Sequence, residues 1–226
     1  MFSSTLCDHA ISLLWSETAD ATIRSMALKI KQMNFKDKVR SIVSSIEILT
    51  KEEIETIVEI TIVDSFKKGT ILLKEGQIPT KCFMVLEGCL REYQIIDGDE
   101  KSTAFYTEGE KCTSYVNDGR GVPSNHYWEC VEDCILTISH QKFEDQLRTL
   151  MPRLDAIITH IAKEKLNHAK EEWSHFITSS PEKRYLNLLE NRSNLLNRVP
   201  HHQIASYLGM KPQSLSRIRK RTLEKG

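Results

Sequence analysis

The sequence predicts an α+β protein: an N-terminal roll of antiparallel strands, then a long helix, then a small C-terminal helix-turn-helix module. Two observations carry this prediction. Between residues 64 and 139, short apolar runs are separated by glycine turns at intervals of about ten residues, which is typical of antiparallel β structure. From His140 onward, apolar residues recur instead at helical spacing.

Composition places the chain among ordinary soluble globular proteins. Of its 226 residues 40% are hydrophobic, and 31 Lys and Arg balance 31 Asp and Glu. It contains no apolar run of about 18 residues, so no membrane span is expected. The N-terminus lacks the basic start and apolar core of a secretion signal, so we expect a cytoplasmic location.

The cysteines do not form a metal-binding pattern. None of the six belongs to a C-x2-C pair, and the proximity of Cys7 to His9 supplies only two ligands, so no metal site is expected. Four of the cysteines lie in or beside strand-like runs, where a reduced thiol packs as a small apolar group. A redox role stays open.

The first 35 residues read as a separate extension, with a helix near residues 18–33. Thr50 followed by Glu53 forms a capping box ahead of an amphipathic helix. A sensor-like β domain is expected over residues 36–150. Its strands are separated by the turns Lys68-Gly69, Glu75-Gly76, Glu87-Gly88, Asp97-Gly98 and Glu132-Asp133, and it ends in a short helix after Ser139.

A long helix of about 24 residues is expected over residues 151–178, after a break at Pro152. Its apolar stripe begins with Leu154, Ile157, Ile158 and Ile161. The stripe is suited to packing on the roll and, given its length and coiled-coil-like spacing, at least equally to pairing with a second copy of the chain, so it is the predicted dimer interface of a dimerisation helix.

The last module, residues 179–226, opens with Ser180 as helix cap and Pro181 at the first helical position. It then matches a helix-turn-helix. Gly209 supplies the turn, Ala205 lets the helices approach closely, and the remaining inward or helix-starting positions are Ile204, Leu208, Met210, Pro212, Leu215 and Ile218.

Positive charge gathers on the second helix of this motif. From Lys211 onward there are six basic residues and one acid. With Leu215 and Ile218 inward, Gln213, Ser214 and Arg217 are predicted to contact DNA bases. Predicted phosphate contacts are His202, Lys211, Arg219, Lys220 and Arg221. Double-stranded DNA is therefore the expected partner.

With these motifs the chain resembles the Crp/Fnr superfamily of bacterial transcription regulators over residues 36–223. The stretch FKKGTILLKEGQIPTKCFMVLEGCLREY is similar to its cyclic-nucleotide-binding β roll, and IASYLGMKPQSLSRIRK resembles the form common in Bacteroidetes. The resemblance implies a homodimer that reads an inverted repeat and acts on RNA polymerase.

The sequence departs from that family at the effector site. Members that bind cyclic AMP hold its phosphate with Gly-Glu and Arg-Ser/Thr pairs. Here the matching positions are Thr113-Ser114 and Ser124-Asn125, and Arg120 is the nearest basic substitute. Without a matched cation a buried phosphate is costly, so cyclic AMP is not expected and the effector is unknown. The family's β-hairpin wing is also not expected after the last helix.

Two functions are compatible with these patterns. The first is a DNA-binding transcription regulator with a sensor roll whose ligand is unknown or lost. The second is a signalling module that binds a cyclic nucleotide or another small molecule and whose helical tail contacts protein instead of DNA. No pattern of catalytic residues stands out, so the chain is not expected to be an enzyme.

Overall fold

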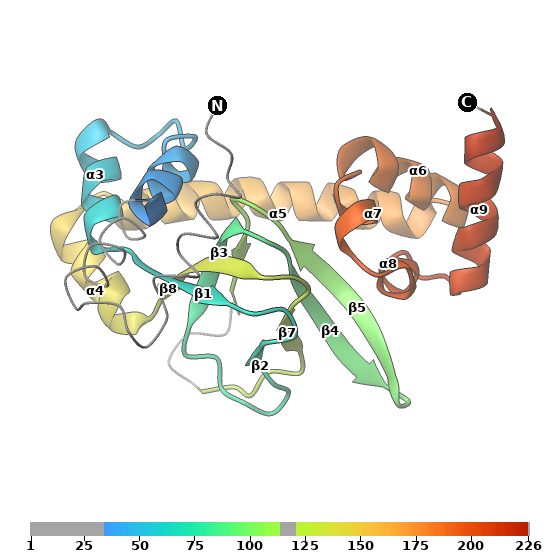
Figure 1. The fold of residues 1–226 in the computed structure, drawn as a ribbon. Coiled ribbons are helices and arrows are strands. Elements are labelled where there is room, and N and C mark those ends of the chain that lie inside the picture. Colours follow the sequence, from blue (N-terminus) through green and yellow to red (C-terminus); the bar gives the residue numbers. More distant parts are fainter. Residues whose placement is uncertain (1–33, 114–120, 226) are drawn as a thin grey trace, which may run out of the picture. The chain divides into compact units, whose positions relative to one another are not determined.

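A computed structural model describes residues 34–113 and 121–225 of the chain (Figure 1). The predicted helix near residues 18–33 lies outside them. The chain divides into two compact units, with the boundary between Ile60 and Thr61. In the first unit, a helix over residues 34–43 precedes α3 (Lys51–Ile60). The predicted capping box is present: the Thr50 amide donates to the Glu53 carboxylate at 2.8 Å, and the Glu53 amide donates to Thr50 Oγ1 at 3.2 Å.

The second unit begins with the predicted β roll, which is built of two antiparallel four-stranded sheets. Their orders are β1-β8-β3-β6 and β2-β7-β4-β5. The strands are β1 (Ile62–Phe66), β2 (Ile71–Leu73), β3 (Cys82–Glu87), β4 (Leu90–Ile96), β5 (Asp99–Tyr106), β6 (Lys111–Cys112), β7 (Tyr127–Cys130) and β8 (Cys134–Ser139).

Glycine is required at two of the predicted turns. At Gly88, with φ of +104°, a Cβ would lie 2.7 Å from Cys134 Sγ, so only glycine allows β3 and β4 to approach β8. At the β4–β5 turn, Asp97 and Gly98 both have positive φ, as a two-residue hairpin of the favoured twist demands. In Figure 1 this hairpin runs downward and to the right below α7 and α8, with its tip pointing away from them.

The core between the sheets is apolar and holds most of the described cysteines. It consists of Leu73, Phe83, Val85, Leu90, Cys112, Trp128, Cys130, Cys134 and Leu136. The five described cysteines are all free and buried. Burial raises the pKa of Cys89 to about 12, so its thiol stays protonated at neutral pH. The Cys89 thiol therefore packs as an apolar group.

The helical half follows the predicted order with one addition. It contains α4 (Gln141–Leu150), α5 (Leu154–Thr178), α6 (Pro181–Asn191), α7 (Leu195–Arg198), α8 (His201–Tyr207) and α9 (Pro212–Lys225). Ser180 Oγ accepts from the Lys183 amide at 3.3 Å and caps α6 as predicted. The short α7 was not predicted. No helix in the described ranges is long and apolar enough to cross a membrane.

The long helix α5 has only its first two turns buried within the chain. Leu154 is 6% and Ile157 3% exposed, so these two predicted stripe residues pack against their own chain and are not free to pair with another. Ile161 is half-buried, and Ile158 is exposed. From residue 162 to residue 175 every position is exposed. The apolar face left open consists of Ile158, Leu166, Trp173 and Ile177.

Candidate nucleic-acid interface

The predicted helix-turn-helix is formed by α8, the turn after it and α9. Gly209 has φ of +66°, a left-handed conformation that glycine adopts without strain. The turn is closed by backbone hydrogen bonds from Gly209 to Ser206 (3.0 Å) and from Met210 to Ala205 (3.0 Å). Pro212 begins α9, where its missing amide hydrogen costs nothing.

Five predicted inward positions are all buried: Ile204, Ala205, Leu208, Leu215 and Ile218. They belong to one apolar cluster with Tyr185 and Leu188 of α6. Ala205 is completely buried, which agrees with its prediction as the small residue at the helix crossing. This packing determines which face of α9 is turned outward.

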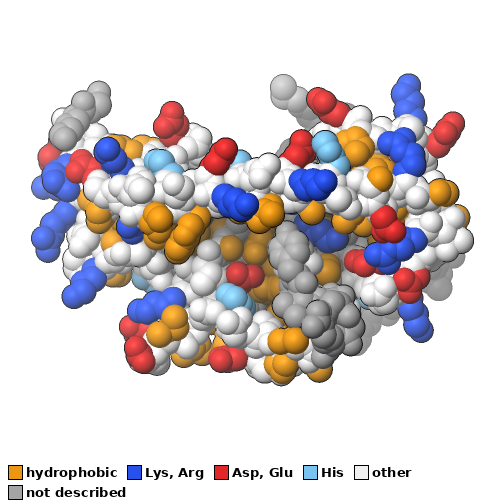
Figure 2. All heavy atoms as spheres, turned by 180° about the vertical axis from the view of Figure 1, so that it is seen from behind, with side chains coloured by type: hydrophobic (Ala, Val, Ile, Leu, Met, Phe, Trp, Pro, Cys, Tyr) orange, Lys and Arg blue, Asp and Glu red, His pale blue; other side chains and the backbone are white. Residues whose placement is uncertain are grey.

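The outward face of α9 carries the predicted base-contacting side chains. Gln213 and Arg217 are exposed and Ser214 is half-buried. The five predicted phosphate-contacting residues, His202, Lys211, Arg219, Lys220 and Arg221, are all exposed. Two of them form long ion pairs: Lys220 Nζ lies 3.9 Å from a Glu224 carboxylate oxygen, and Arg221 Nη2 lies 3.7 Å from one of Glu182. Figure 2 shows blue side chains gathered at its left edge, the end of the molecule formed by α9.

Arg184 of α6 connects the turn of this motif to the end of α5. Its Nε donates to the Phe176 carbonyl at 3.0 Å, and Nη1 donates to the Leu208 carbonyl at 3.1 Å. Its guanidinium also lies 4.1 Å from the centre of the Phe176 ring. A Cβ at Gly209 would come within 3.1 Å of Arg184 Nη1. Nothing in the sequence singles out Arg184, because an arginine in a helical pattern gives no sign of which backbone carbonyls its side chain will contact.

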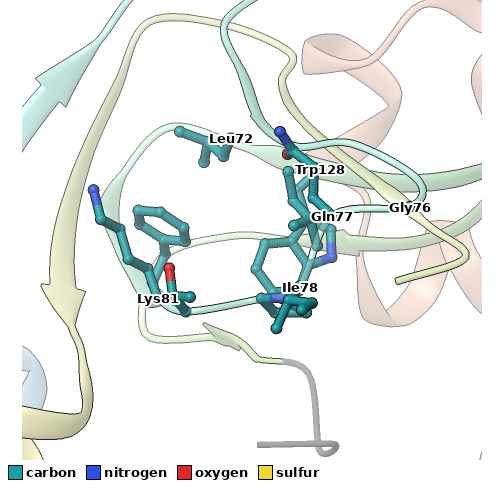
Figure 3. A pocket seen from close by; sticks show the side chains of 10 residues that line it. Leu72, Gly76, Gln77, Ile78, Lys81 and Trp128 are labelled. Carbon is teal, nitrogen blue, oxygen red and sulfur yellow. The ribbon is translucent and has the colours of Figure 1, made fainter. Parts of the chain in front are cut away.

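The predicted effector residues are only partly described, since Ser114 and Arg120 lie outside the described ranges. Thr113 Oγ1 lies 3.1 Å from Cys82 Sγ. Ser124 is tied to the β2–β3 connection by backbone hydrogen bonds with Gly76 and Gln77, both 2.8 Å, and Asn125 is exposed. A nearby cavity of about 440 Å³ is lined by other residues, among them Leu72, Gln77, Ile78, Lys81 and Trp128 (Figure 3). Thr113, Ser124 and Asn125 do not line it.

A carboxylate is held on the inner side of β4. Glu92 is 16% exposed and accepts from Trp128 Nε1 (3.0 Å), Tyr106 Oη (3.2 Å) and Thr103 Oγ1 (3.0 Å). His126 Nε2 lies 3.7 Å from the same carboxylate. Within the described residues, no three His, Cys, Asp or Glu side chains form a metal-binding group.

Solved structures of several bacterial regulators share this fold. FixK2 of Bradyrhizobium japonicum superposes with a TM-score of 0.62 at 18% identity, covering 74% of this chain and 86% of that one. CLP of Xanthomonas campestris, a c-di-GMP-responsive global regulator, gives 0.61 at 16% identity over 78% and 93%. A mutant of CooA from Carboxydothermus hydrogenoformans gives 0.56 at 14% identity over 76% and 80%.

These likenesses confirm the predicted fold class, a cyclic-nucleotide-binding-like roll followed by a long helix and a helix-turn-helix. No protein-family model matches the sequence, and no curated protein matches it either. At 14–18% identity, the similarity establishes the architecture and leaves the ligand and the target to be argued from the residues.

Proposed function

We propose that the protein is a transcription regulator that binds double-stranded DNA sequence-specifically through α9. The observation that carries this proposal is the division of α9 into two faces. Leu215 and Ile218 are buried, while Gln213 and Arg217 point outward from its N-terminal half. Arg pairs with guanine and Gln with adenine through two hydrogen bonds each, and this half of the helix enters the major groove in helix-turn-helix proteins.

The regulator acts as a homodimer through α5. A helix exposed on every side over residues 162–175 gains little from its own chain and requires a partner for stability. Leu166 and Trp173 lie on one face there and are 56% and 65% exposed. Pairing two copies along this face would present two α9 helices to half-sites about 34 Å apart on an inverted repeat. RNA polymerase is the partner through which such a regulator would act.

The roll is the sensor domain of this proposal, and cyclic AMP is not its effector. Glu92 lies on the inner side of β4, and its oxygens already accept from three donors. A phosphate buried in the roll would need a matched cation, which the positions corresponding to the family's phosphate site do not supply. Catalysis has no part in this proposal, and the output is DNA binding.

The test is selection of bound fragments from sheared genomic DNA by the purified protein, at two salt concentrations, with and without cyclic AMP. Enrichment of one inverted repeat without ligand would support the proposal. Enrichment that requires cyclic AMP would refute the argument about the effector. Binding without any enriched sequence, or no salt-dependent binding at all, would favour a tail that contacts protein instead.

A further inference from the structure

Two arginines of the C-terminal helices bind carboxylates on the turns of the roll. Arg198, at the end of α7, contacts Glu108 through Nη1 (2.9 Å) and Nη2 (2.8 Å), and Glu132 through Nε (2.8 Å) and Nη2 (2.6 Å). Arg192, just after α6, donates from Nη2 to Glu110 (2.6 Å) and to the Phe105 carbonyl (3.0 Å). We call these five charged residues the clamp.

Beside the clamp, where Arg192 contacts the Phe105 carbonyl, β5 and α8 form an apolar and neutral contact. The rings of Phe105 and Tyr207 meet edge to face with their centres 5.3 Å apart. Ser206 Oγ accepts from the Ser102 amide at 3.0 Å and lies 3.2 Å from the Glu100 carbonyl. Roll residues Cys89, Phe105 and Val131 share a buried cluster with the helix-turn-helix core. The helix-turn-helix is therefore docked on the roll by buried area as well as by charge.

The clamp carboxylates are themselves fixed within the roll. Glu108 Oε1 also accepts from the Gly88 amide at 2.9 Å, and Glu110 Oε2 accepts from the amide and hydroxyl of Thr107 at 2.6 and 3.0 Å. Glu108 and Glu110 lie on the turn that joins β5 to β6. β6 leads directly to Thr113, the first of the predicted effector residues. Movement at β6 would reach the arginines through this turn.

From these contacts we infer that the clamp is the device by which the roll sets the position of α9 for DNA reading. Arg192 and Arg198 act as positioning residues. They hold the helix-turn-helix on the roll while the base-reading side chains Gln213 and Arg217 stay exposed. The clamp holds each α9 in one orientation, so that a dimer accepts one half-site spacing. This inference rests on the proposed function and adds the route from the roll to the reading helix.

The test removes the clamp from either side. Arg198→Met removes the guanidinium that binds Glu108 and Glu132. The double variant Glu108→Gln with Glu132→Gln removes the two carboxylates without changing the helix-turn-helix. The matched control is Arg148→Met, since Arg148 also binds acids, Asp145 and Asp155, but joins α4 to α5. Affinity is measured on the repeat selected by the wild type and on versions with one base pair added or removed between half-sites. Hydrogen exchange of the Ser102 amide reports docking separately.

Both clamp variants are expected to lose about tenfold in affinity for the selected repeat, because only the molecules with α9 in the reading position bind. They should also lose much of their preference for one spacing and exchange the Ser102 amide faster, while Arg148→Met behaves as wild type. A variant that is merely destabilised would bind less at every spacing alike.

Three results would overturn the inference. If the double glutamine variant keeps wild-type affinity and spacing preference, the clamp does not position α9. If it binds more tightly, the docked state opposes DNA binding. If only Arg198→Met is weak and its salt dependence is reduced, Arg198 contacts a phosphate directly. A wild type that selects no repeat would instead contradict the proposed function itself.

Discussion

At the scale of single residues, Arg217 and Arg219 provide a matched pair on one helix. Both are exposed, but they lie two positions apart and so face different directions around α9. Arg217→Ala is expected to cost about 1–3 kcal/mol in specific binding and to relax base preference at one position. Arg219→Ala should weaken all sequences alike and reduce the salt slope by about one. Competition binding on single-base operator variants distinguishes the two, and an unchanged base preference in Arg217→Ala would refute its reading role.

A second prediction at this scale concerns Gly209. Both Gly209→Ala and the control Gly98→Ala place a Cβ on a backbone with positive φ, which costs about 1–2 kcal/mol. No atom lies within 4 Å of a Cβ at Gly98, whereas at Gly209 it meets Arg184 Nη1 at 3.1 Å. Gly209→Ala should therefore lower the free energy of unfolding more than Gly98→Ala does, and should also weaken DNA binding. Equal losses in urea denaturation would mean that Arg184 moves aside freely.

At the scale of elements, α5 gives the clearest prediction. Leu166→Asp combined with Trp173→Asp places two charges on the open apolar face, and both positions are exposed in the single chain, so the fold should persist. The expected result is a monomer by light scattering, with loss of binding to the inverted repeat. Ile96→Asp, at an isoleucine of the β4–β5 hairpin that is 47% exposed, is the control and should remain dimeric. A dimeric double variant would place the interface elsewhere.

At the element scale, α5 shows which features can be predicted from the sequence and which cannot. Its length and its break at Pro152 follow from local rules, and so do the capped α3 and α6 and the glycine turns of the roll. How the stripe from Leu154 divides between its own chain and a partner could not be predicted, because periodicity gives a face and not what covers it. The helix α7 was not predicted, because four residues are too few to show a periodic pattern.

At the scale of the whole molecule, the reading face was predictable and its attachment was not. Gln213, Arg217 and their inward neighbours lie within one short motif whose spacing defines both faces of α9. The clamp instead joins Arg198 to Glu108 and Arg192 to Glu110 across 90 and 82 residues of sequence. Such pairs depend on how the roll and the helices pack together, which the sequence does not give. Because arginine and glutamate are common on protein surfaces, their presence alone does not indicate a pair.

The clamp also predicts how stability depends on pH. Burial alone would raise the pKa of Glu108, but the hydrogen bonds from Arg198 and Gly88 outweigh it and hold the pKa below its ordinary value of 4.5. A group whose pKa is lowered in the folded state stabilises the fold above its unfolded pKa, and this contribution is lost as the pH falls through the folded value. The free energy of unfolding of the wild type should therefore fall on acidification below pH 4.5 more steeply than that of Glu108→Gln.

Urea denaturation of the wild type and of Glu108→Gln at a series of pH values measures this difference. The two free energies of unfolding should differ most near neutrality and converge in acid. Arg198→Met should flatten the curve in the same way, because it removes the cation that lowers the pKa of Glu108. Both variants retain all other carboxylates of the chain, so the shared part of the acid response cancels in the comparison. Curves that stay parallel from neutrality to acid would mean that Arg198 and Glu108 are not paired in solution, and that the helix-turn-helix is held on the roll by the Phe105–Tyr207 contact and its apolar surroundings alone.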